Sequence, residues 1–124
     1  MKNYIIVTGG AGFVGSNLIE FLLTKTDKKI ISIDNYSSGL KKNHIKNSKV
    51  KYFAANTKDI NKVLSKYKNQ IHSLFHFGEF ARIFQSFNKF EDCFGSNSIG
   101  TQAVFKFCLD NKIKLIYSAT SASL

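Results

Sequence analysis

The segment VTGGAGFVGS joins a short apolar run to an amphipathic stretch, and it restricts the possible folds more than any other part of the chain. Its glycines Gly9, Gly12 and Gly15 have G-x-x-G-x-x-G spacing at a predicted strand-to-helix junction. Gly9 allows a sharp turn, Gly12 leaves the backbone open to a phosphate, and Gly15 lets the helix pack closely on the strand. The N–H groups near Phe13 and Val14 would point at a pyrophosphate from the positive end of the helix dipole. The alternative is a glycine-rich loop that only packs tightly.

The same alternation of apolar and amphipathic segments continues along the chain and is typical of a parallel α/β sheet. The predicted strands are Tyr4–Gly9, Lys29–Asp34, Val50–Ala55, Ile71–Phe77 and Ile113–Ala119. The predicted helices are Phe13–Lys25, Lys58–Tyr67 and about Phe90–Asp110, and the apolar face of the first comprises Val14, Leu18, Phe21 and Leu22. Right-handed crossovers make this a doubly wound parallel sheet, with ligands expected at the carboxyl ends of the strands. Residues 1–124 are long enough for a single domain.

Composition excludes several other classes of protein. The formal net charge of +10 comes almost entirely from scattered lysines, and Arg82 is the only arginine, so a nucleic-acid partner is disfavoured. No apolar stretch is long enough to span a membrane and the N-terminus does not resemble a signal peptide, so a cytoplasmic location is expected. Cys93 and Cys108 fall in one predicted helix about 22 Å apart, too far for a disulfide. No spacing of cysteine and histidine predicts a metal site.

Asp34 ends the second predicted strand, 19 residues after Gly15. This is the usual interval for the acidic residue that accepts hydrogen bonds from the ribose hydroxyls of a dinucleotide. A carboxylate there would repel a 2′-phosphate, so we predict NAD rather than NADP. The alternative is that Asp34 merely begins a turn with Asn35.

Five motifs in order carry a family resemblance, namely TGGAGFVGSNL, DNYSSG, LFHFG, NSIGT and IYSATS. With them the chain resembles the extended short-chain dehydrogenase/reductases, and within these the NAD-dependent nucleotide-sugar epimerases and dehydratases. The UDP-glucose 4-epimerase branch is the most similar. The resemblance implies a Rossmann, NAD(P)-binding fold truncated after the fifth strand, so that residues 1–124 form one incomplete NAD-binding domain. It also implies NAD as cofactor and a nucleotide sugar as substrate, and it is compatible with a homodimer of the full-length parent.

The resemblance also implies roles for individual residues. Asp34 and Asn35 would hold the adenosine ribose, and Asn56 stands where the family usually has an aspartate that contacts the adenine. An amide oxygen at Asn56 could still accept a bond from the adenine amino group. The remaining implied cofactor-binding residues are Gly9, Gly12, Phe13, Val14 and Gly15 at the pyrophosphate, Phe77 and Gly78 beside the nicotinamide, and Asn97 and Ser118.

Two interpretations are open for each of two polar residues near the fourth predicted strand. His76 matches a family marker, but a satisfied core histidine is at least as consistent with its place on a buried strand. Glu79 departs from the small residues usual there, and it either faces the sugar or pairs with Arg82 one helical turn later.

Thr120 is the implied catalytic residue, hydrogen-bonding the sugar hydroxyl that is oxidised, with Ser118 and Ser121 beside it. The family base is a tyrosine in a Tyr-x-x-x-Lys pair, in which the lysine lowers the phenol pKa. No Tyr-x-x-x-Lys occurs in these residues, so we expect the pair to lie beyond Leu124 and the isolated chain to be inactive. The alternative functions are a stand-alone NAD-binding module without catalysis and, through the lysine excess, a nucleic-acid binder.

Overall fold

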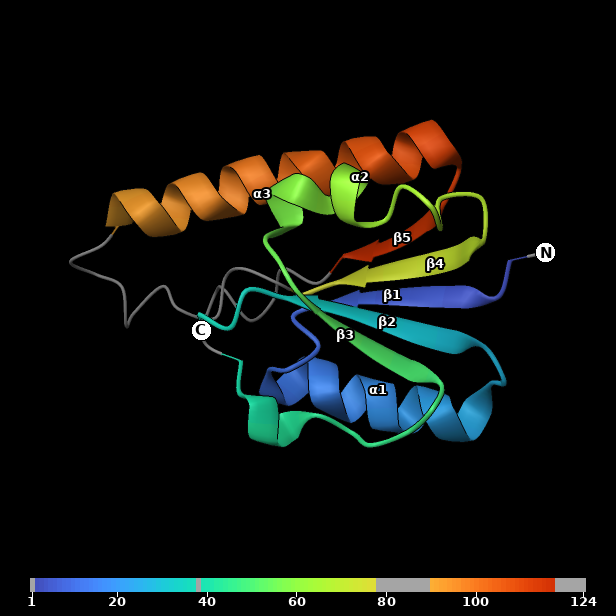
Figure 1. Ribbon diagram of the computed structural model, residues 1–124. Helices are drawn as coiled ribbons and strands as arrows, with labels where there is room; N and C mark the ends of the chain where they lie inside the picture. The colour runs from blue at the N-terminus through green and yellow to red at the C-terminus, as the bar shows by residue number, and fades with distance from the viewer. Residues whose placement is uncertain (1, 38, 78–89, 118–124) are drawn as a thin grey trace.

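The computed structural model describes residues 2–37, 39–77 and 90–117, and within 90–98 it describes the helix backbone alone. These residues form a five-stranded, all-parallel sheet in the order β3-β2-β1-β4-β5 (Figure 1). The strands are β1 (Tyr4–Thr8), β2 (Lys29–Asp34), β3 (Val50–Ala54), β4 (Ile71–His76) and β5 (Lys114–Tyr117). The chain runs outward from β1 to β3 and then returns to the other side of β1, so the strand order reverses between β1 and β4. This confirms the predicted doubly wound parallel sheet.

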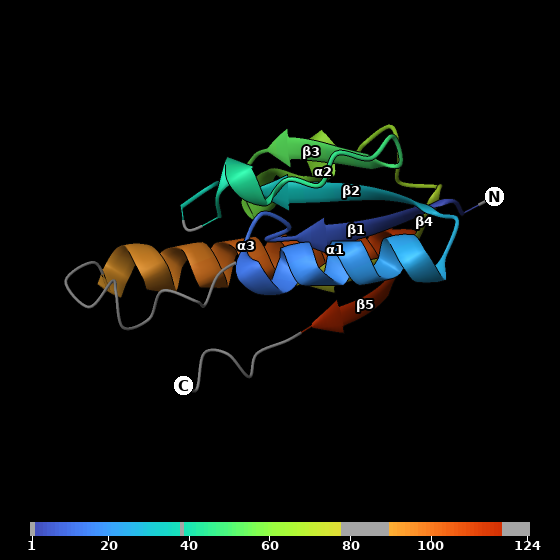
Figure 2. The same cartoon turned by 90° about the horizontal axis from the view of Figure 1, so that it is seen from below.

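Helices cover both faces of the sheet. Figures 1 and 2 show α1 (Phe13–Lys25) on one face, and α2 (Ile60–Val63) and α3 (Phe90–Asn111) on the other. Two short 3-10 helices, η1 (Lys41–Asn43) and η2 (Thr57–Asp59), lie in the connections before and after β3. The face that each helix covers follows from the right-handed crossovers between parallel strands.

The second predicted helix was too long. In the structure, helical backbone in this region is limited to η2 and α2, because beyond Val63 the backbone tightens into successive turns. The N–H of Tyr67 donates to the Leu64 carbonyl oxygen, three residues earlier, and the N–H of Gln70 donates to the Tyr67 carbonyl oxygen. Leu64 and Tyr67 are nevertheless buried, as an amphipathic pattern requires. The apolar spacing was therefore correct and the helical hydrogen bonding was not.

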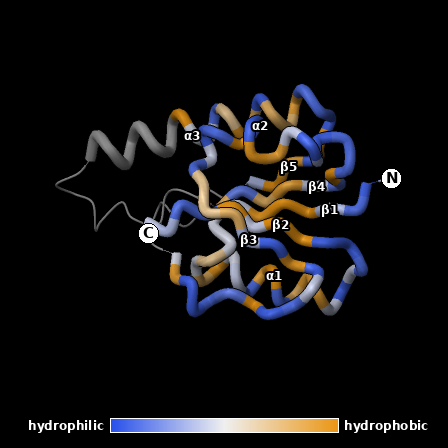
Figure 3. The backbone as a smooth tube through the Cα atoms, in the orientation of Figure 1, coloured by the Kyte–Doolittle hydropathy of each residue, from blue (hydrophilic) through white to orange (hydrophobic). Residues whose placement is uncertain are grey.

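The core consists of two apolar clusters separated by the sheet, and Figure 3 shows the hydrophobic colour concentrated along the strands. The cluster under α1 contains Ile5, Val7, Ile19 and Ile30, and the one under α2 and α3 includes Ile6, Ile31, Ile33, Ile60, Leu64, Leu74, Val104 and Phe107. Successive residues of β1 and β2 alternate between the clusters, as the strand period of two requires. Strands buried on both faces explain the nearly continuous apolar runs in the sequence.

The predicted apolar face of α1 was partly wrong. Val14 and Phe21 are more than half exposed, and the residues turned inward are Gly15 and Ile19, with Leu18 and Leu22 partly buried. Contact between Gly15 and the preceding turn fixes the rotation of the helix. The stripe at positions 15, 18, 19 and 22 then faces the sheet, with helical spacing.

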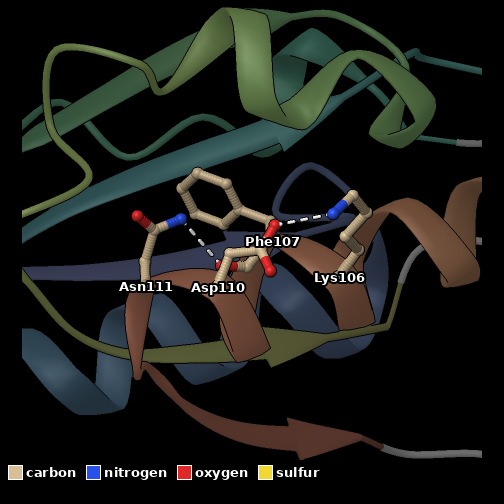
Figure 4. Close-up of polar contacts among 4 residues, drawn as sticks. All are labelled: Lys106, Phe107, Asp110 and Asn111. Atoms are coloured by element: carbon tan, nitrogen blue, oxygen red, sulfur yellow. Dashed lines mark hydrogen bonds and ion pairs between the residues drawn. The ribbon is translucent and has the colours of Figure 1, made fainter.

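Backbone capping ends α3 and delivers the chain to β5. Lys112 has a positive φ of 55°, and the N–H of Ile113 donates to the Cys108 carbonyl oxygen over 2.9 Å, as in a Schellman motif. Figure 4 shows the side-chain contacts of this last turn: Asn111 Nδ2 donates to the Phe107 carbonyl oxygen, and Lys106 pairs with Asp110. The ion pair is exposed and contributes little, so the backbone bonds and the buried Phe107 ring hold the helix end.

Candidate functional site

The glycine turn between β1 and α1 is closed by backbone contacts. Gly9 has a positive φ of 71°, donates its N–H to the Ile33 carbonyl oxygen of β2 and accepts the N–H of Gly12 over 3.1 Å. A Cβ placed on Gly15 would lie 2.1 Å from the Gly9 carbonyl oxygen. The sharp turn predicted at Gly9 is confirmed. The close approach predicted at Gly15 is also present, but it is made to the turn after β1 rather than to the strand.

Gly10 is a further requirement that sequence reasoning missed. A Cβ there would lie 2.1 Å from Ser32 Oγ of β2, a buried hydroxyl without a hydrogen-bond partner among the described residues. The turn therefore lies flat against the end of β2. The second glycine of TGGAG was the available signal.

The start of α1 can receive an anion. Gly12 is the N-cap residue and supplies no side-chain cap, and the first turn of the helix carries no acidic residue. Among the residues the structure describes, no acceptor bonds the N–H groups of Phe13 or Val14, whereas the N–H of Ser16 already donates to the Gly12 carbonyl oxygen. Free N–H groups at the positive end of a 13-residue helix are suited to a phosphate.

Asp34 connects the glycine turn to the loop after β2. Its Oδ2 accepts the Ala11 N–H over 3.0 Å and its Oδ1 accepts the Tyr36 N–H over 2.8 Å. A Cβ on Gly39 would lie 2.5 Å from Oδ2, so a third segment closes over the carboxylate. The bond from the Tyr36 N–H forms the turn after Asp34 that the alternative interpretation expected. The bond from the Ala11 N–H was expected neither by that interpretation nor by the ribose-binding one. Each oxygen keeps capacity for a further donor, such as a ribose hydroxyl.

The amides of Asn35 and Asn56 meet across the ends of β2 and β3. Asn35 Nδ2 donates to Asn56 Oδ1 over 2.9 Å, while Asn35 Oδ1 accepts the Ser37 N–H over 2.9 Å. Both asparagines are exposed. The structure therefore brings together the residues predicted for the adenosine end of the site.

An aromatic cluster supports the loop behind Asp34. The Tyr36 hydroxyl bonds His44 Nε2, and the His44 ring stacks on Tyr52 with centroids 3.8 Å apart. Burial, and then the negative charge of Asp34, raise the pKa of Tyr36. Burial raises the pKa of Tyr52 as well, against the opposing effect of the Ile45 N–H that bonds its hydroxyl. Both phenols therefore remain neutral and hold the loop by hydrogen bonding.

His76 is a fully buried, hydrogen-bonded histidine at the end of β4. Its Nδ1 lies 2.7 Å from Thr8 Oγ1 and its Nε2 lies 3.2 Å from Thr101 Oγ1. Thr8 also accepts the Phe77 N–H, so one hydroxyl ties β1 to the residue that follows β4. His76 thus has the contacts of the core histidine that one of its two interpretations expected. Phe77, half-buried, is the only residue predicted at the nicotinamide end whose side chain is described.

The other predicted residues of that end fall outside the described part. Gly78, Ser118 and Thr120 lie in segments that the structure does not describe, as does the possible pair of Glu79 with Arg82. Asn97 lies within α3, where only the backbone is described.

Comparison with known proteins identifies the family. Residues 5–124 match the model of the NAD dependent epimerase/dehydratase family. The chain belongs to this family. The predicted resemblance is thereby confirmed, and so, at the level of the family, is NAD as the cofactor.

Members of the NAD-dependent epimerase/dehydratase family resemble the chain over nearly all its length. It is 32% identical to the ADP-L-glycero-D-manno-heptose-6-epimerase of Brachyspira hyodysenteriae, over 97% of this chain and 37% of that protein. The UDP-glucose 4-epimerase of Thermotoga maritima, solved with UDP-glucose, superposes with a TM-score of 0.80 at 25% identity, over 92% of this chain and 37% of that one. The UDP-glucose 4-epimerase of Thermus thermophilus, solved with NAD, gives 0.76 at 26% identity, over 90% and 36%. The chain therefore spans little more than a third of these relatives.

The described residues also lack a metal-ligand cluster and a membrane-spanning helix. Residues 2–37, 39–77 and 90–117 contain no group of three or more metal-ligating side chains. Within the same residues, no helix has the length and apolar character needed to cross a membrane.

Proposed function

We propose that the chain is the NAD-binding portion of a nucleotide-sugar epimerase or dehydratase that oxidises a sugar hydroxyl to a transient ketone, in the manner of a UDP-glucose 4-epimerase. The observation that carries the proposal is the joint geometry of the glycine turn and Asp34. Within the described part of the chain, the N–H groups of Phe13 and Val14 at the start of α1 have no acceptor, and Ala11 of the same turn bonds the Asp34 carboxylate. A pyrophosphate and a ribose would thus be bound from one preformed unit.

The residues present fit NAD along the carboxyl ends of the strands. Gly9, Gly12 and Gly15, with the N–H groups of Phe13 and Val14, would hold the pyrophosphate. Asp34 and Asn35 would bind the adenosine ribose, with Asn56 beside the base. Phe77, Gly78, Asn97 and Ser118 would contact the cofactor toward its nicotinamide end. When bound, NAD would accept a hydride from the sugar carbon, and in an epimerase return it to the opposite face.

Thr120 is proposed to hydrogen-bond the sugar hydroxyl and hold it for deprotonation. The Thr8 hydroxyl bonds His76 and the Phe77 N–H, so the end of β4 is held beside β1. The base is proposed to be a tyrosine of a Tyr-x-x-x-Lys pair that these 124 residues do not contain. The 124-residue polypeptide would then bind NAD without turning over substrate.

An apolar groove supports the view that further polypeptide packs here. It encloses about 480 Å³ beside α3 and β5 and is lined by Phe105, Cys108, Leu109, Lys112, Ile113 and Leu115. Two exposed large apolar side chains, Phe105 and Leu109, lie together in its lining, and contiguous exposed apolar surface of this kind marks a site where another segment packs. The relatives, of which the chain spans little more than a third, are long enough to supply a covering segment.

The test compares the natural polypeptide with residues 1–124 alone. Each is incubated with NAD and a panel of nucleotide sugars that includes UDP-glucose, and the sugar products are identified by NMR. We expect the natural polypeptide to epimerise or dehydrate one sugar and residues 1–124 to bind NAD without turnover. Sustained turnover by residues 1–124 would contradict the assignment of the base. A natural polypeptide that binds NAD but converts no sugar would instead support the stand-alone module.

A further inference from the structure

We propose that Asn56 presents a hydrogen-bond donor to the purine of the bound dinucleotide, so that the site does not select the 6-amino group of adenine. The inference rests on the proposed NAD site and adds the basis on which the base is recognised. It predicts that a dinucleotide with a 6-oxo purine binds about as tightly as NAD.

The place of the base follows from the topology. In a doubly wound sheet, a dinucleotide lies across the carboxyl ends of the strands at the point where the strand order reverses, here between β1 and β4. The pyrophosphate belongs at the start of α1 and the ribose at Asp34. The base then extends outward over the ends of β2 and β3, where Asn35 and Asn56 form their hydrogen bond.

A backbone donor determines the orientation of both amides. The Ser37 N–H can only donate, and it donates to Asn35 Oδ1, so Asn35 must turn its Nδ2 toward Asn56. Asn56 must then accept this bond with its Oδ1, which lies 2.9 Å from Asn35 Nδ2. The group of Asn56 left without a partner among the described residues is its Nδ2, which carries two N–H donors, whereas Oδ1 already accepts one bond. Turning either amide over would place two donors or two acceptors face to face.

Asn56 does not use this side chain for helix capping, the local role in which asparagine is most common. It is the N-cap residue of η2, yet its side chain makes no cap hydrogen bond, and only its main-chain carbonyl accepts the Asp59 N–H. Among the residues the structure describes, no acceptor bonds Asn56 Nδ2. The exposed donor is therefore available to a ligand beside the two amides.

An aspartate at the same position would present the opposite chemistry. One of its oxygens could accept the Asn35 Nδ2–H, and the other would face outward as an acceptor suited to the adenine amino group. The outward donor of Asn56 cannot bond an amino group, but it can bond a ring nitrogen of adenine or the O6 of a 6-oxo purine. A 6-oxo purine carries a hydrogen on N1, so a bond from Asn56 Nδ2 to N1 of adenine would move to O6, and this donor would keep an acceptor in both purines.

The test measures dissociation constants by calorimetry for NAD and for nicotinamide hypoxanthine dinucleotide, its 6-oxo analogue, with the natural polypeptide. The readout is the dissociation constant of the 6-oxo analogue divided by that of NAD. Any effect of a substitution on the stability of the protein changes both constants and cancels in this ratio. We expect a ratio below about threefold in the wild type. Asn56→Asp should raise it by about tenfold, because a carboxylate would face O6 without a proton between them.

A second variant tests the orientation mechanism without altering Asn56. In Asn35→Asp, both carboxylate oxygens accept, so Asn56 must turn its Nδ2 inward and its oxygen outward, and the ratio should again rise. The matched control is Asn69→Asp, which adds the same charge at an exposed position just before β4, at the amino ends of the parallel strands rather than at their carboxyl ends, and should leave the ratio unchanged.

The outcomes separate this proposal from the NAD site on which it rests. NAD binding with a wild-type ratio of threefold or more, or an Asn56→Asp ratio within threefold of the wild type, overturns the proposal and leaves the NAD site standing. Absence of NAD binding overturns both.

Discussion

Replacing Gly15 by alanine tests whether the closed turn is essential to the fold and to the pyrophosphate site. The added Cβ would lie 2.1 Å from the Gly9 carbonyl oxygen, 2.8 Å from the Gly9 carbonyl carbon and 2.9 Å from Gly10 Cα. All three are backbone atoms, so no side chain can rotate away. Reaching an ordinary contact of 3.4 Å requires the helix and turn to separate by about 1.3 Å.

The magnitude is the difference between two opposing effects. Alanine in place of glycine inside a helix contributes about 1 kcal/mol of stability. Overpacking typically costs about 1–3 kcal/mol and more where the backbone must move. We expect Gly15→Ala to lower the free energy of unfolding by about 2 kcal/mol, and to weaken NAD binding about tenfold because the phosphate-binding N–H groups move with the helix.

The assay is urea unfolding of the natural polypeptide together with calorimetric NAD titration. For the unfolding measurement, Gly12→Ala is the matched control in the same turn, since its Cβ would lie 3.3 Å from the Gly9 carbonyl oxygen, and its N-cap φ of −82° suits alanine. That variant should lose about 1 kcal/mol or less. If Gly15→Ala were as stable as the wild type within about 0.5 kcal/mol, or less damaging than Gly12→Ala, the inferred closure of the turn would be refuted.

Two further predictions concern buried groups. Thr8→Val removes the hydroxyl shared by His76 and the Phe77 N–H, and urea unfolding should show a free energy of unfolding lower by about 2–3 kcal/mol. The control Thr24→Val, at an exposed position, should lower it by under about 0.5 kcal/mol. Equal losses in the two variants would contradict the buried network. Burial raises the pKa of the Cys108 thiol to about 11, so the folded state favours the neutral thiol: Cys108 should lower stability as pH rises from about 9 to about 11 and have no such effect below that range. Peptide-resolved alkylation at pH 9 checks this, and labelling of folded protein as fast as of unfolded protein would contradict it.

Features encoded by neighbouring residues could be predicted from the sequence. The bounds of α1 were predicted as the structure has them, and the strands ended within two residues of their predicted ends wherever those ends are described. The turn at Gly9 needs only local backbone freedom, which glycine supplies. Asp34 was placed at a strand end by the apolar run before it.

Features that depend on distant contacts could not be predicted in the same way. Thr8 and His76 are 68 residues apart in sequence, and Ala11 and Asp34 are 23 apart, so no local pattern pairs them. The exposure of Val14 and Phe21 follows from the rotation that Gly15 imposes on α1, which hydropathy alone does not contain.

The most direct test of the central claim, an NAD site formed by the glycine turn and Asp34, is titration of the natural polypeptide with NAD and NADP. We predict that the wild type binds NAD at least about tenfold more tightly than NADP, because the carboxylate repels a 2′-phosphate. Asp34→Asn, which keeps the shape but not the charge, should remove most of that preference, while exposed Asp27→Asn should retain it. Equal affinities of the wild type for the two dinucleotides, or an unchanged preference in Asp34→Asn, would contradict the claim.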